Sequence, residues 1–330
     1  MSTVSVNLLT FNGEKYLNNC FQSLLSQSFF DFQVIVIDNN SSDSSLEIIK
    51  KFQLEFKKSG IDFKLVLNKK NIGFACGHNQ GIEMATNSRY ILPLNQDVVL
   101  DKDYLKELVS FMEKNKNCAG ATGKIFRLTN GEKTDIIDSL GLKLFKSFQV
   151  ADRESGKKEE KRYDQIEKVF GVSATCPLYR KKALESIKLG NDYFDSDFKT
   201  YKEDVDLAFR LSDKGWSFYY VPSAIAWHKR SAAGKEKRGF WEVLNNYRNR
   251  SFFINYYSYR NHLFLLVKNL KFQDFLKNFP FIFWYEIKKF IFLLFWEPRV
   301  LKAWGDFFKK LPKMLKKRKN MKFQQKDFSG

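Results

Sequence analysis

Asp97 has surroundings that favour metal or phosphate chemistry. It follows an apolar run at residues 90–94, with Asn95 and Gln96 between the run and the carboxylate. Such a run is typical of a buried parallel strand, and ligands bind at the carboxyl ends of these strands because loops converge there on a crevice. A carboxylate in this place commonly holds a divalent cation shared with a substrate phosphate. For this residue alone, a turn-forming aspartate is an equally good interpretation.

Glu203 and Asp204 form a second acidic site. They begin a segment in which three apolar residues recur at helical spacing and share one face: Val205, Ala208 and Phe209. We therefore expect the pair in the first turn of a helix that packs by this face and stops near residues 214–215. The helix dipole favours acidic residues there whatever their function. A carboxylate fixed on a packed helix beside a pocket can also act as a general base, so both interpretations stay open.

The elements that would position these acids alternate between strand and helix. Apolar runs occur at residues 4–9, 32–37, 63–67 and 90–94, and helical spacing follows the first two. This alternation predicts parallel βαβ units with right-handed crossovers, hence an α/β fold with a Rossmann-like, mostly parallel sheet flanked by helices. The chain has neither a Gly-x-Gly-x-x-Gly motif after the first strand nor a Gly-Lys-Ser/Thr loop. A dinucleotide enzyme and a P-loop NTPase are therefore disfavoured.

Two further segments have residues suited to nucleotide binding. Asp38 ends the second strand, where it could bond a base or ribose or could cap the next helix. Residues 71–81 contain three glycines, which permit close backbone approach to a ligand, and Asn79 begins or lies within a helix there. Residues 170–180 include several small side chains, which allow the backbone to pack tightly. Such a segment can lie under a pocket or can form a plain buried turn. The charged segment 157–162 is expected to be mobile.

A strand is predicted at residues 216–221, followed by Pro222 and a second short apolar run that ends in His228. A lone histidine is usually structural. His228 could nevertheless reach an ion held by Asp97, and a carboxylate with an imidazole suits Mn²⁺ as well as Mg²⁺.

The net charge of +19 is concentrated at one end of the chain. Residues 230–330 carry 23 of the 56 basic side chains and only 7 of the 37 acidic ones. Lysines alternate there with aromatic and aliphatic residues, a pattern typical of helices that lie on an anionic membrane surface. Ordinary core helices with a solvated basic tail are the alternative. The apolar stretch 279–296 is interrupted by three charged residues, so we interpret it as interfacial rather than transmembrane.

The four cysteines are scattered without paired spacing, which disfavours a zinc site or a disulfide framework and fits a reducing cytosolic compartment. No signal-peptide pattern is seen at the N-terminus.

Six segments, in one order, resemble the family 2 glycosyltransferases, especially the rhamnosyltransferase-like branch. They are Val6-Asn7-Leu8-Leu9-Thr10-Phe11-Asn12, Val36-Ile37-Asp38-Asn39-Asn40-Ser41-Ser42-Asp43, Asn71-Ile72-Gly73-Phe74-Ala75, Leu94-Asn95-Gln96-Asp97, Tyr201-Lys202-Glu203-Asp204-Val205-Asp206-Leu207, and Val221-Pro222 through His228. The resemblance covers about residues 3–270.

The resemblance implies an A-type glycosyltransferase fold, a nucleotide-sugar donor, Mg²⁺ or Mn²⁺, and inversion at the anomeric carbon. It assigns Asp204 as the base with Glu203 beside it, Asp97 as a metal ligand and His228 as an additional one. The motif at Asp97 is Asn-Gln-Asp rather than Asp-x-Asp, so it offers one carboxylate. The residues expected to contact the nucleotide sugar are Thr10, Asn12, Asp38, Asn39, Asn71, Gly73, Phe74, Asn79 and Asn95.

We therefore predict a catalytic domain at residues 1–235 and a basic, aromatic-rich helical region at 236–330 on the inner face of the cell membrane. The expected acceptor is a glycan, lipid-linked or an oligosaccharide, used in bacterial cell-surface polysaccharide synthesis. Arg248, Arg250 and Arg260 are expected to contact its diphosphate. Rhamnose is the leading donor sugar, and no nucleic-acid partner is expected. The alternatives are a non-enzymatic basic protein that binds membrane or nucleic acid and a nucleotidyltransferase, although residues 10–15 lack the glycine-rich basic loop that the latter needs.

Overall fold

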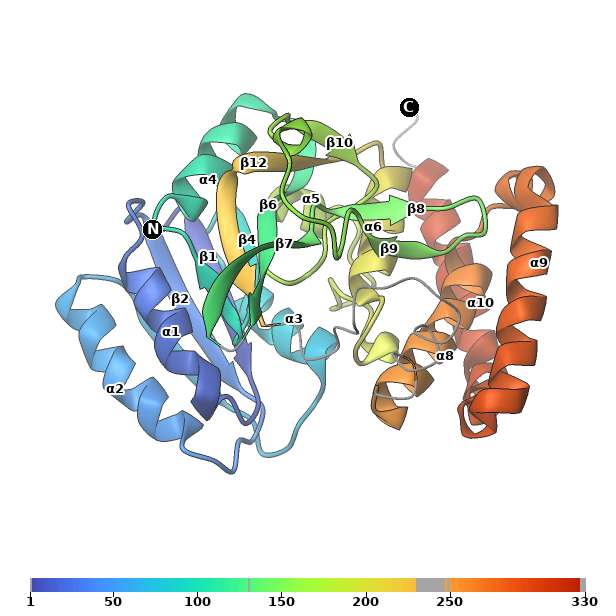
Figure 1. The fold of residues 1–330 in the computed structure, drawn as a ribbon, viewed down its shortest axis with the longest axis horizontal. Helices are drawn as coiled ribbons and strands as arrows, with labels where there is room; N and C mark the ends of the chain where they lie inside the picture. The colour runs from blue at the N-terminus through green and yellow to red at the C-terminus, as the bar shows by residue number, and fades with distance from the viewer. Residues whose placement is uncertain (1, 130, 230–246, 248–249, 327–330) are drawn as a thin grey trace.

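The computed structural model describes residues 2–129, 131–229, 247 and 250–326 (Figure 1). The first four long strands are parallel neighbours in the order β4-β1-β2-β3. Their bounds are β1 Val4–Thr10, β2 Phe32–Asp38, β3 Phe63–Leu67 and β4 Tyr90–Asn95. Three helices connect them: α1 Glu14–Leu25, α2 Ser45–Lys58 and α3 Phe74–Met84. The predicted mostly parallel, Rossmann-like sheet flanked by helices is confirmed.

The same sheet continues beyond β4 with strands of both directions. β11 runs antiparallel to both β4 and β6, whereas the long β12 runs parallel to β6. The bounds are β5 Val98–Leu100, β6 Cys118–Thr129, β7 Glu132–Ser139, β10 Glu167–Val169, β11 Leu178–Arg180 and β12 Ser217–His228. Helices α4 Tyr104–Lys114, α5 Lys181–Glu185 and α6 Glu203–Asp213 lie between these strands in the chain.

Strand β12 differs from the prediction. Pro222 does not end it, because the register against β6 shifts between Val221 and Ile225 and the proline lies in that irregular stretch. A proline has no N–H to donate, and bulges are where a sheet tolerates it. The strand therefore reaches His228, which pairs with Val98 next to Asp97.

Alternating strand residues supply a core on each face of the sheet. Val34 and Val36 belong to one core, with α1, α2 and α4, whereas Ile35 and Ile37 belong to the other, with α3, α5 and α6. This two-layer burial follows from the two-residue period of a strand. It explains why the parallel strands are apolar along their whole length.

The C-terminal helices form a third core together with α6 and residues 142–150. They are α8 Phe252–Asn269, α9 Phe272–Trp296 and α10 Ala303–Lys326, and the short β8 Leu142–Leu144 and β9 Val150–Asp152 form a hairpin beside them. Val205 and Phe209 of α6 pack into this core. In Figure 1, α9 lies at the outer edge. Within the described part of the chain, no helix combines the length and apolarity needed to cross a membrane.

The charged segment 157–162, predicted to be mobile, is instead bonded to the sheet. The N–H of Ile137 donates to the carbonyl of Lys157 at 2.8 Å, and Lys158 forms a β-bridge with Ile136. Lys124, which is 4% exposed, pairs with Glu159 and Asp164. Glu159 of this segment therefore neutralises a buried lysine.

Candidate active site

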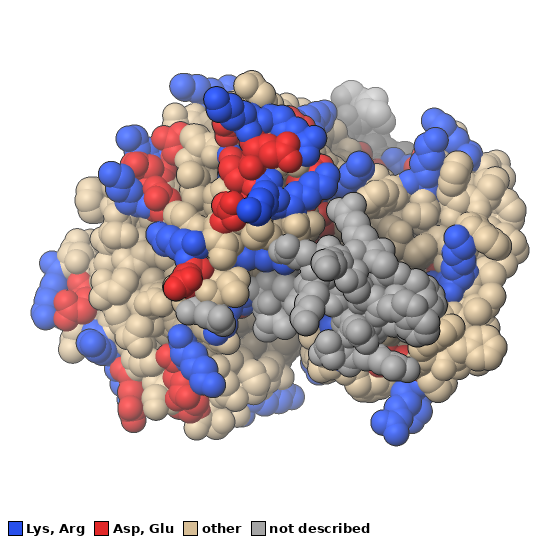
Figure 2. Space-filling view, in the orientation of Figure 1, with Lys and Arg blue, Asp and Glu red and all other residues tan. Residues whose placement is uncertain are grey.

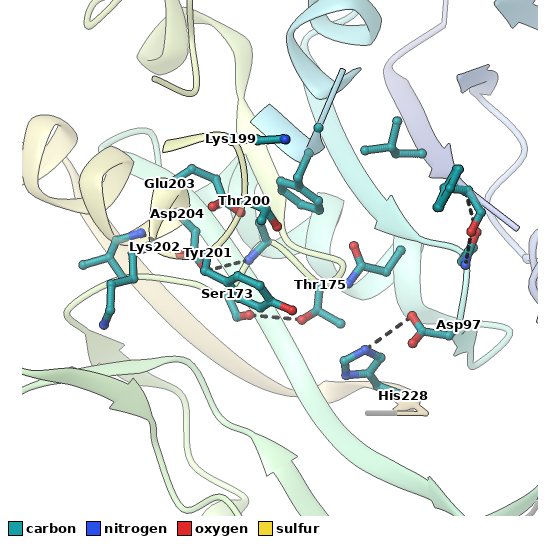
Figure 3. Close-up of a pocket in the computed structure, with 18 of the residues that line it drawn as sticks. Asp97, Ser173, Thr175, Lys199, Thr200, Tyr201, Lys202, Glu203, Asp204 and His228 are labelled. Atoms are coloured by element: carbon teal, nitrogen blue, oxygen red, sulfur yellow. Dashed lines mark hydrogen bonds and ion pairs between the residues drawn. The ribbon is translucent and has the colours of Figure 1, made fainter. Parts of the chain in front are cut away.

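A cavity of about 720 Å³ opens at the carboxyl ends of β1 and β4 (Figure 3). Its walls come from segments far apart in the chain, including the turn after β4, the β9 strand, residues 173–175 and residues 199–205. Ten of the predicted site residues line it: Thr10, Asn39, Asn71, Gly73, Phe74, Asn95, Asp97, Glu203, Asp204 and His228. The fold thus brings the two acidic segments and the histidine to one space.

One wall carries Asp97 and His228. The Oδ1 of Asp97 lies 3.4 Å from Nε2 of His228, and Nδ1 of the same ring lies 2.8 Å from Oδ2 of Asp138 on β7. Burial alone would lower the pKa of His228, but the hydrogen bonds to Asp138 and Asp97 outweigh it and raise that pKa to about 10. The imidazole therefore lies between two carboxylates, with Nδ1 bonded to Asp138 and Nε2 turned toward Asp97.

This wall fits a divalent cation with two protein ligands. A histidine that ligates a metal usually has its other ring nitrogen bonded to a carboxylate, as His228 has with Asp138. Among the described residues no cluster of three or more His, Cys, Asp or Glu side chains could hold an ion. A diphosphate would supply the remaining oxygen ligands, which is the common arrangement for Mg²⁺.

The opposite wall carries Glu203 and Asp204 at the start of α6. Two backbone N–H groups hold the Asp204 carboxylate: Ala174 donates to Oδ2 at 3.2 Å and Val205 to Oδ1 at 2.8 Å. Burial raises the pKa of Asp204, and the charge of Asp152 raises it further. Glu203 is 5% exposed, and its Oε2 has no hydrogen-bond partner among the described residues. Burial, followed by the charge of Asp204, raises the pKa of Glu203 well above its ordinary value.

The polypeptide reaches this wall through an unusual turn. Lys199, Tyr201 and Lys202 have φ angles of 64°, 66° and 67°, in the left-handed region that L-residues rarely adopt. All three residues line the cavity, as Thr200 between them does. Figure 3 shows this segment and the acid pair on one side of the cavity, with Asp97 and His228 on the other.

Three predicted nucleotide-sugar residues do not line the cavity. Asp38 accepts bonds from the N–H and hydroxyl of Ser41, at 3.0 and 2.5 Å, and Asn12 accepts from the N–H of Ser42 at 2.9 Å. Asn79 donates to the carbonyl of Phe194 at 2.8 Å. Asp38 therefore fixes the loop after β2 and does not cap α2, which begins at Ser45 with Ser44 as its N-cap. The nucleotide contact of Asp38 stays a prediction.

The two predicted acceptor arginines that the structure describes, Arg250 and Arg260, do not line the cavity. Arg260 is 4% exposed and donates to the carbonyls of Asp197 and Phe198, at 2.8 and 3.0 Å, so its guanidinium is used inside the fold. Arg250 is exposed and is not among the residues that line the cavity. Arg248 lies outside the described residues.

Several lining residues were not foreseen as site residues. Gln96 accepts bonds from the Thr10 hydroxyl and the Phe11 N–H, at 2.6 and 3.0 Å, and so fixes the loop after β1. Asp152 lines the cavity from β9, whereas Asp138 on β7 does not line it and acts through its contact with His228; both come from a part of the sequence without a recognisable motif. Lys199 and Lys202 stand just before the acid pair, and their proximity to it was the only available signal.

Solved structures with this architecture define the class of the fold. The structure of GalNAc-T7 with UDP, GalNAc and Mn²⁺ aligns with a TM-score of 0.57 and 16% identity, over 80% of this chain and 51% of that one. The structure of S. aureus TarS 1–349 in complex with UDP-GlcNAc aligns with a TM-score of 0.54 and 16% identity, over 98% of this chain and 87% of that one. The chain has an A-type glycosyltransferase fold.

The sequence profile of glycosyl transferase family 2 matches residues 5–188, more than half of the chain, and the chain belongs to this family. Poly-beta-1,6-N-acetyl-D-glucosamine synthase of Staphylococcus epidermidis is 28% identical over 224 residues, 68% of this chain and 49% of that protein. The chain thus spans about half the length of this curated relative.

A second relative comes from Methanococcus voltae. It is a dolichyl N-acetyl-alpha-D-glucosaminyl phosphate 3-beta-D-2,3-diacetamido-2,3-dideoxy-beta-D-glucuronosyltransferase, 23% identical over 71% of this chain and 70% of its own length. The predicted family is therefore confirmed, while the rhamnosyltransferase-like branch stays a prediction.

Proposed function

We propose that the chain transfers a sugar from a nucleotide-diphosphate sugar to a glycan acceptor with inversion at the anomeric carbon. The observation that carries this proposal is the arrangement of one cavity, with the Asp97–His228 pair on one wall and the Glu203–Asp204 pair on the other. A group that accepts a proton and a group that offsets departing negative charge must lie on opposite sides of the reacting carbon for a direct displacement.

Asp204 is the proposed base. Its carboxylate accepts the proton of an acceptor hydroxyl while that oxygen forms a bond to C1 of the sugar and the bond from C1 to the diphosphate oxygen breaks. The bonds from the N–H groups of Ala174 and Val205 orient the carboxylate. Its raised pKa makes it a stronger base than an exposed aspartate. One displacement from the side opposite the leaving group inverts the configuration.

Asp97 and His228 are the proposed ligands of Mg²⁺ or Mn²⁺. A bound cation would offset the charge that develops on the departing diphosphate. The contact between Asp138 and His228 fixes the ring so that Nε2 points to Asp97. The residues on the β1, β2 and α3 side of the cavity, among them Thr10, Asn39 and Asn71, are the proposed contacts of the nucleotide sugar.

The donor sugar is proposed from similarity alone, and two candidates compete. Rhamnose follows from the resemblance to the rhamnosyltransferase-like branch. An N-acetylhexosamine is suggested by the S. epidermidis relative, which is named for N-acetylglucosamine, and by the TarS structure with UDP-GlcNAc. Both sugars must therefore be offered in the same assay.

We further propose that residues 236–330 hold the enzyme on the inner, cytoplasmic face of the membrane, where it meets a lipid-linked acceptor. Helix α9 supports this proposal, because only Ile282 and Leu293 among its 25 residues are buried. Its exposed aromatic residues include Phe272, Phe281, Phe283, Trp284 and Phe295. In Figure 2 the right-hand lobe, where Figure 1 places α9, is largely tan with separate blue patches and little red. Apolar side chains beside cations suit an anionic leaflet.

The deciding experiment offers purified protein UDP, dTDP and GDP sugars with an acceptor lipid, with and without Mn²⁺ or Mg²⁺. Release of nucleotide diphosphate and NMR of the product identify the donor and the anomeric configuration. We expect one donor class to turn over, with metal dependence and inversion. Folded protein that binds no nucleotide sugar under any of these conditions would refute the proposal, and a product with retained configuration would refute the mechanism.

A further inference from the structure

The turn before the acid pair needs support from outside itself. Three of its residues, Lys199, Tyr201 and Lys202, have left-handed backbone conformations, and none of them is glycine. Such conformations persist only where the surrounding structure holds them. The backbone carbonyls of this segment must also find donors, because the segment is packed against α8 and is not part of a regular helix or strand.

Asn261 of α8 supplies those donors. Its side chain is 0% exposed, and its amide nitrogen donates to the carbonyls of Phe198, Thr200 and Tyr201 at 2.9, 2.8 and 2.7 Å. One amide group therefore contacts three carbonyls within four residues of the turn. The neighbouring Arg260 fixes the orientation of the amide, because its Nε and Nη2 donate to Oδ1 of Asn261 at 3.0 and 2.9 Å.

This turn connects the wall of Glu203 and Asp204 with the start of α3. Its C-terminal end leads directly into Glu203 and Asp204. At its other end the carbonyl of Lys199 accepts a bond from the N–H of Ala75 at 3.1 Å, and Ala75 lies in the first turn of α3, beside the predicted nucleotide-sugar residues Gly73 and Phe74. A displaced turn would therefore move the proposed base relative to the donor.

We propose that Asn261 is a positioning residue for the transfer reaction: through the carbonyls of residues 198–201 it holds Asp204 in its place in the cavity. The inference rests on the proposed role of Asp204. It gives Asn261 and Arg260 of α8 a shared role in supporting the turn, instead of the diphosphate contact that the sequence predicted for Arg260. A displacement of about 1 Å at a reacting group lowers turnover about 100-fold.

The test compares Asn261→Ala with Asn255→Ala. Asn255 lies on the same helix and is 3% exposed, but its amide donates to the Tyr247 carbonyl and the Glu297 carboxylate, at 3.0 and 2.9 Å, not to the turn. We expect amide hydrogen exchange in residues 198–204 to be at least about 10-fold faster in Asn261→Ala only. We expect kcat of that variant to fall about 100-fold, with the donor KM within about threefold of the wild type.

Asn261→Asp separates hydrogen bonding from packing. Aspartate fills the same volume but cannot donate to three carbonyls, so this variant should resemble Asn261→Ala. If Asn261→Asp keeps wild-type exchange and kcat, or if the two alanine variants lose the same kcat and exchange alike, Asn261 has only a packing role. Should Asn261→Ala not fold, Asn261→Ser, which keeps one donor, takes its place in the comparison. Wild-type protein without turnover on any donor would refute the proposed function, whereas the exchange measurement would still decide whether Asn261 holds the turn.

Discussion

The acidic groups on the two walls of the cavity lie in opposite electrostatic environments. On one wall Asp97 and Asp138 face the two nitrogens of His228, whose pKa they raise to about 10 against the effect of burial. On the other wall Glu203 and Asp204 are adjacent carboxyl groups, and burial raises the pKa of each. The first wall therefore stabilises positive charge, either on the imidazole or on a cation that would replace its proton at Nε2. The second disfavours negative charge and suits a group that takes up a proton.

Replacing Asp204 tests the second wall and should have the largest effect. Asp204→Asn keeps the shape of the side chain but removes its ability to accept a proton, so we expect kcat to fall about 10²–10⁴-fold. Donor binding, measured by calorimetry, should stay unchanged. Asp213→Asn, at the other end of α6 where it pairs with Lys271, is the matched control and should keep its activity. A loss of less than about tenfold in Asp204→Asn would assign the base elsewhere.

Replacing Asp97 tests the first wall. Asparagine has no charge to attract a cation, and we expect Mn²⁺ affinity in the presence of donor to weaken about 100-fold or more. Asp138→Asn should weaken Mn²⁺ affinity by about 10–100-fold, because Asp138 orients the ligand His228 but is not itself a proposed ligand. A titration of Mn²⁺ followed by donor binding measures both. If both variants kept wild-type activity in the absence of metal, the role given to this wall would be contradicted.

The pH dependence of kcat distinguishes the walls further. A base must be deprotonated, so kcat should rise with pH through the pKa of Asp204 in the complex and level off above it. Because that pKa is raised by burial and then by Asp152, the rise should occur above pH 3.8, the ordinary value. Asp152→Asn removes this negative charge and should move the rise to lower pH. Movement to higher pH would show that Asp152 does not act on the base through its charge.

The sequence predicted the sheet and the acid pair because each depends on local periodicity. The apolar runs that end at Asp38 and Asn95 follow strand spacing, and the helix that begins at Glu203 follows helical spacing. The predicted end of the strand before Pro222 was wrong, because a strand continues through a proline where a bulge accommodates it. The bulge depends on pairing with the neighbouring strand.

The contacts that a side chain makes were harder to predict than the helix or strand to which it belongs. Arg260 looked like a phosphate ligand among aromatic residues, yet it is buried against backbone carbonyls more than 60 positions away. Asp138 and Asn261 belong to no motif. They gain their contacts only when β7 and β12 both pair with β6 and when α8 packs on the turn at residues 198–202. Burial and long-range pairing are properties of the folded chain, and a single sequence carries little record of them.

Replacing Glu203 should have the smallest effect, and unlike the other substitutions it should improve a property of the protein, its stability. Its pKa is raised in the folded protein, so the folded state holds this proton more tightly than the unfolded state does. Below pH 4.5, the ordinary value, the carboxyl is protonated in both states and costs nothing. As pH rises above 4.5 only the unfolded chain readily ionises, which lowers the free energy of unfolding until the folded pKa is passed. Glu203→Gln cannot ionise and should escape this penalty.

We therefore expect Glu203→Gln to be more stable than the wild type at neutral pH and equally stable near pH 4. A gain of about 2–4 °C in Tm at pH 7.5 would correspond to roughly 1 kcal/mol in a domain of this size. Thermal unfolding at both pH values measures the difference. A variant that is less stable at pH 7.5 would mean that Glu203 is held by a favourable bond to its charged form, and the contrast between the two walls would then rest on Asp204 alone.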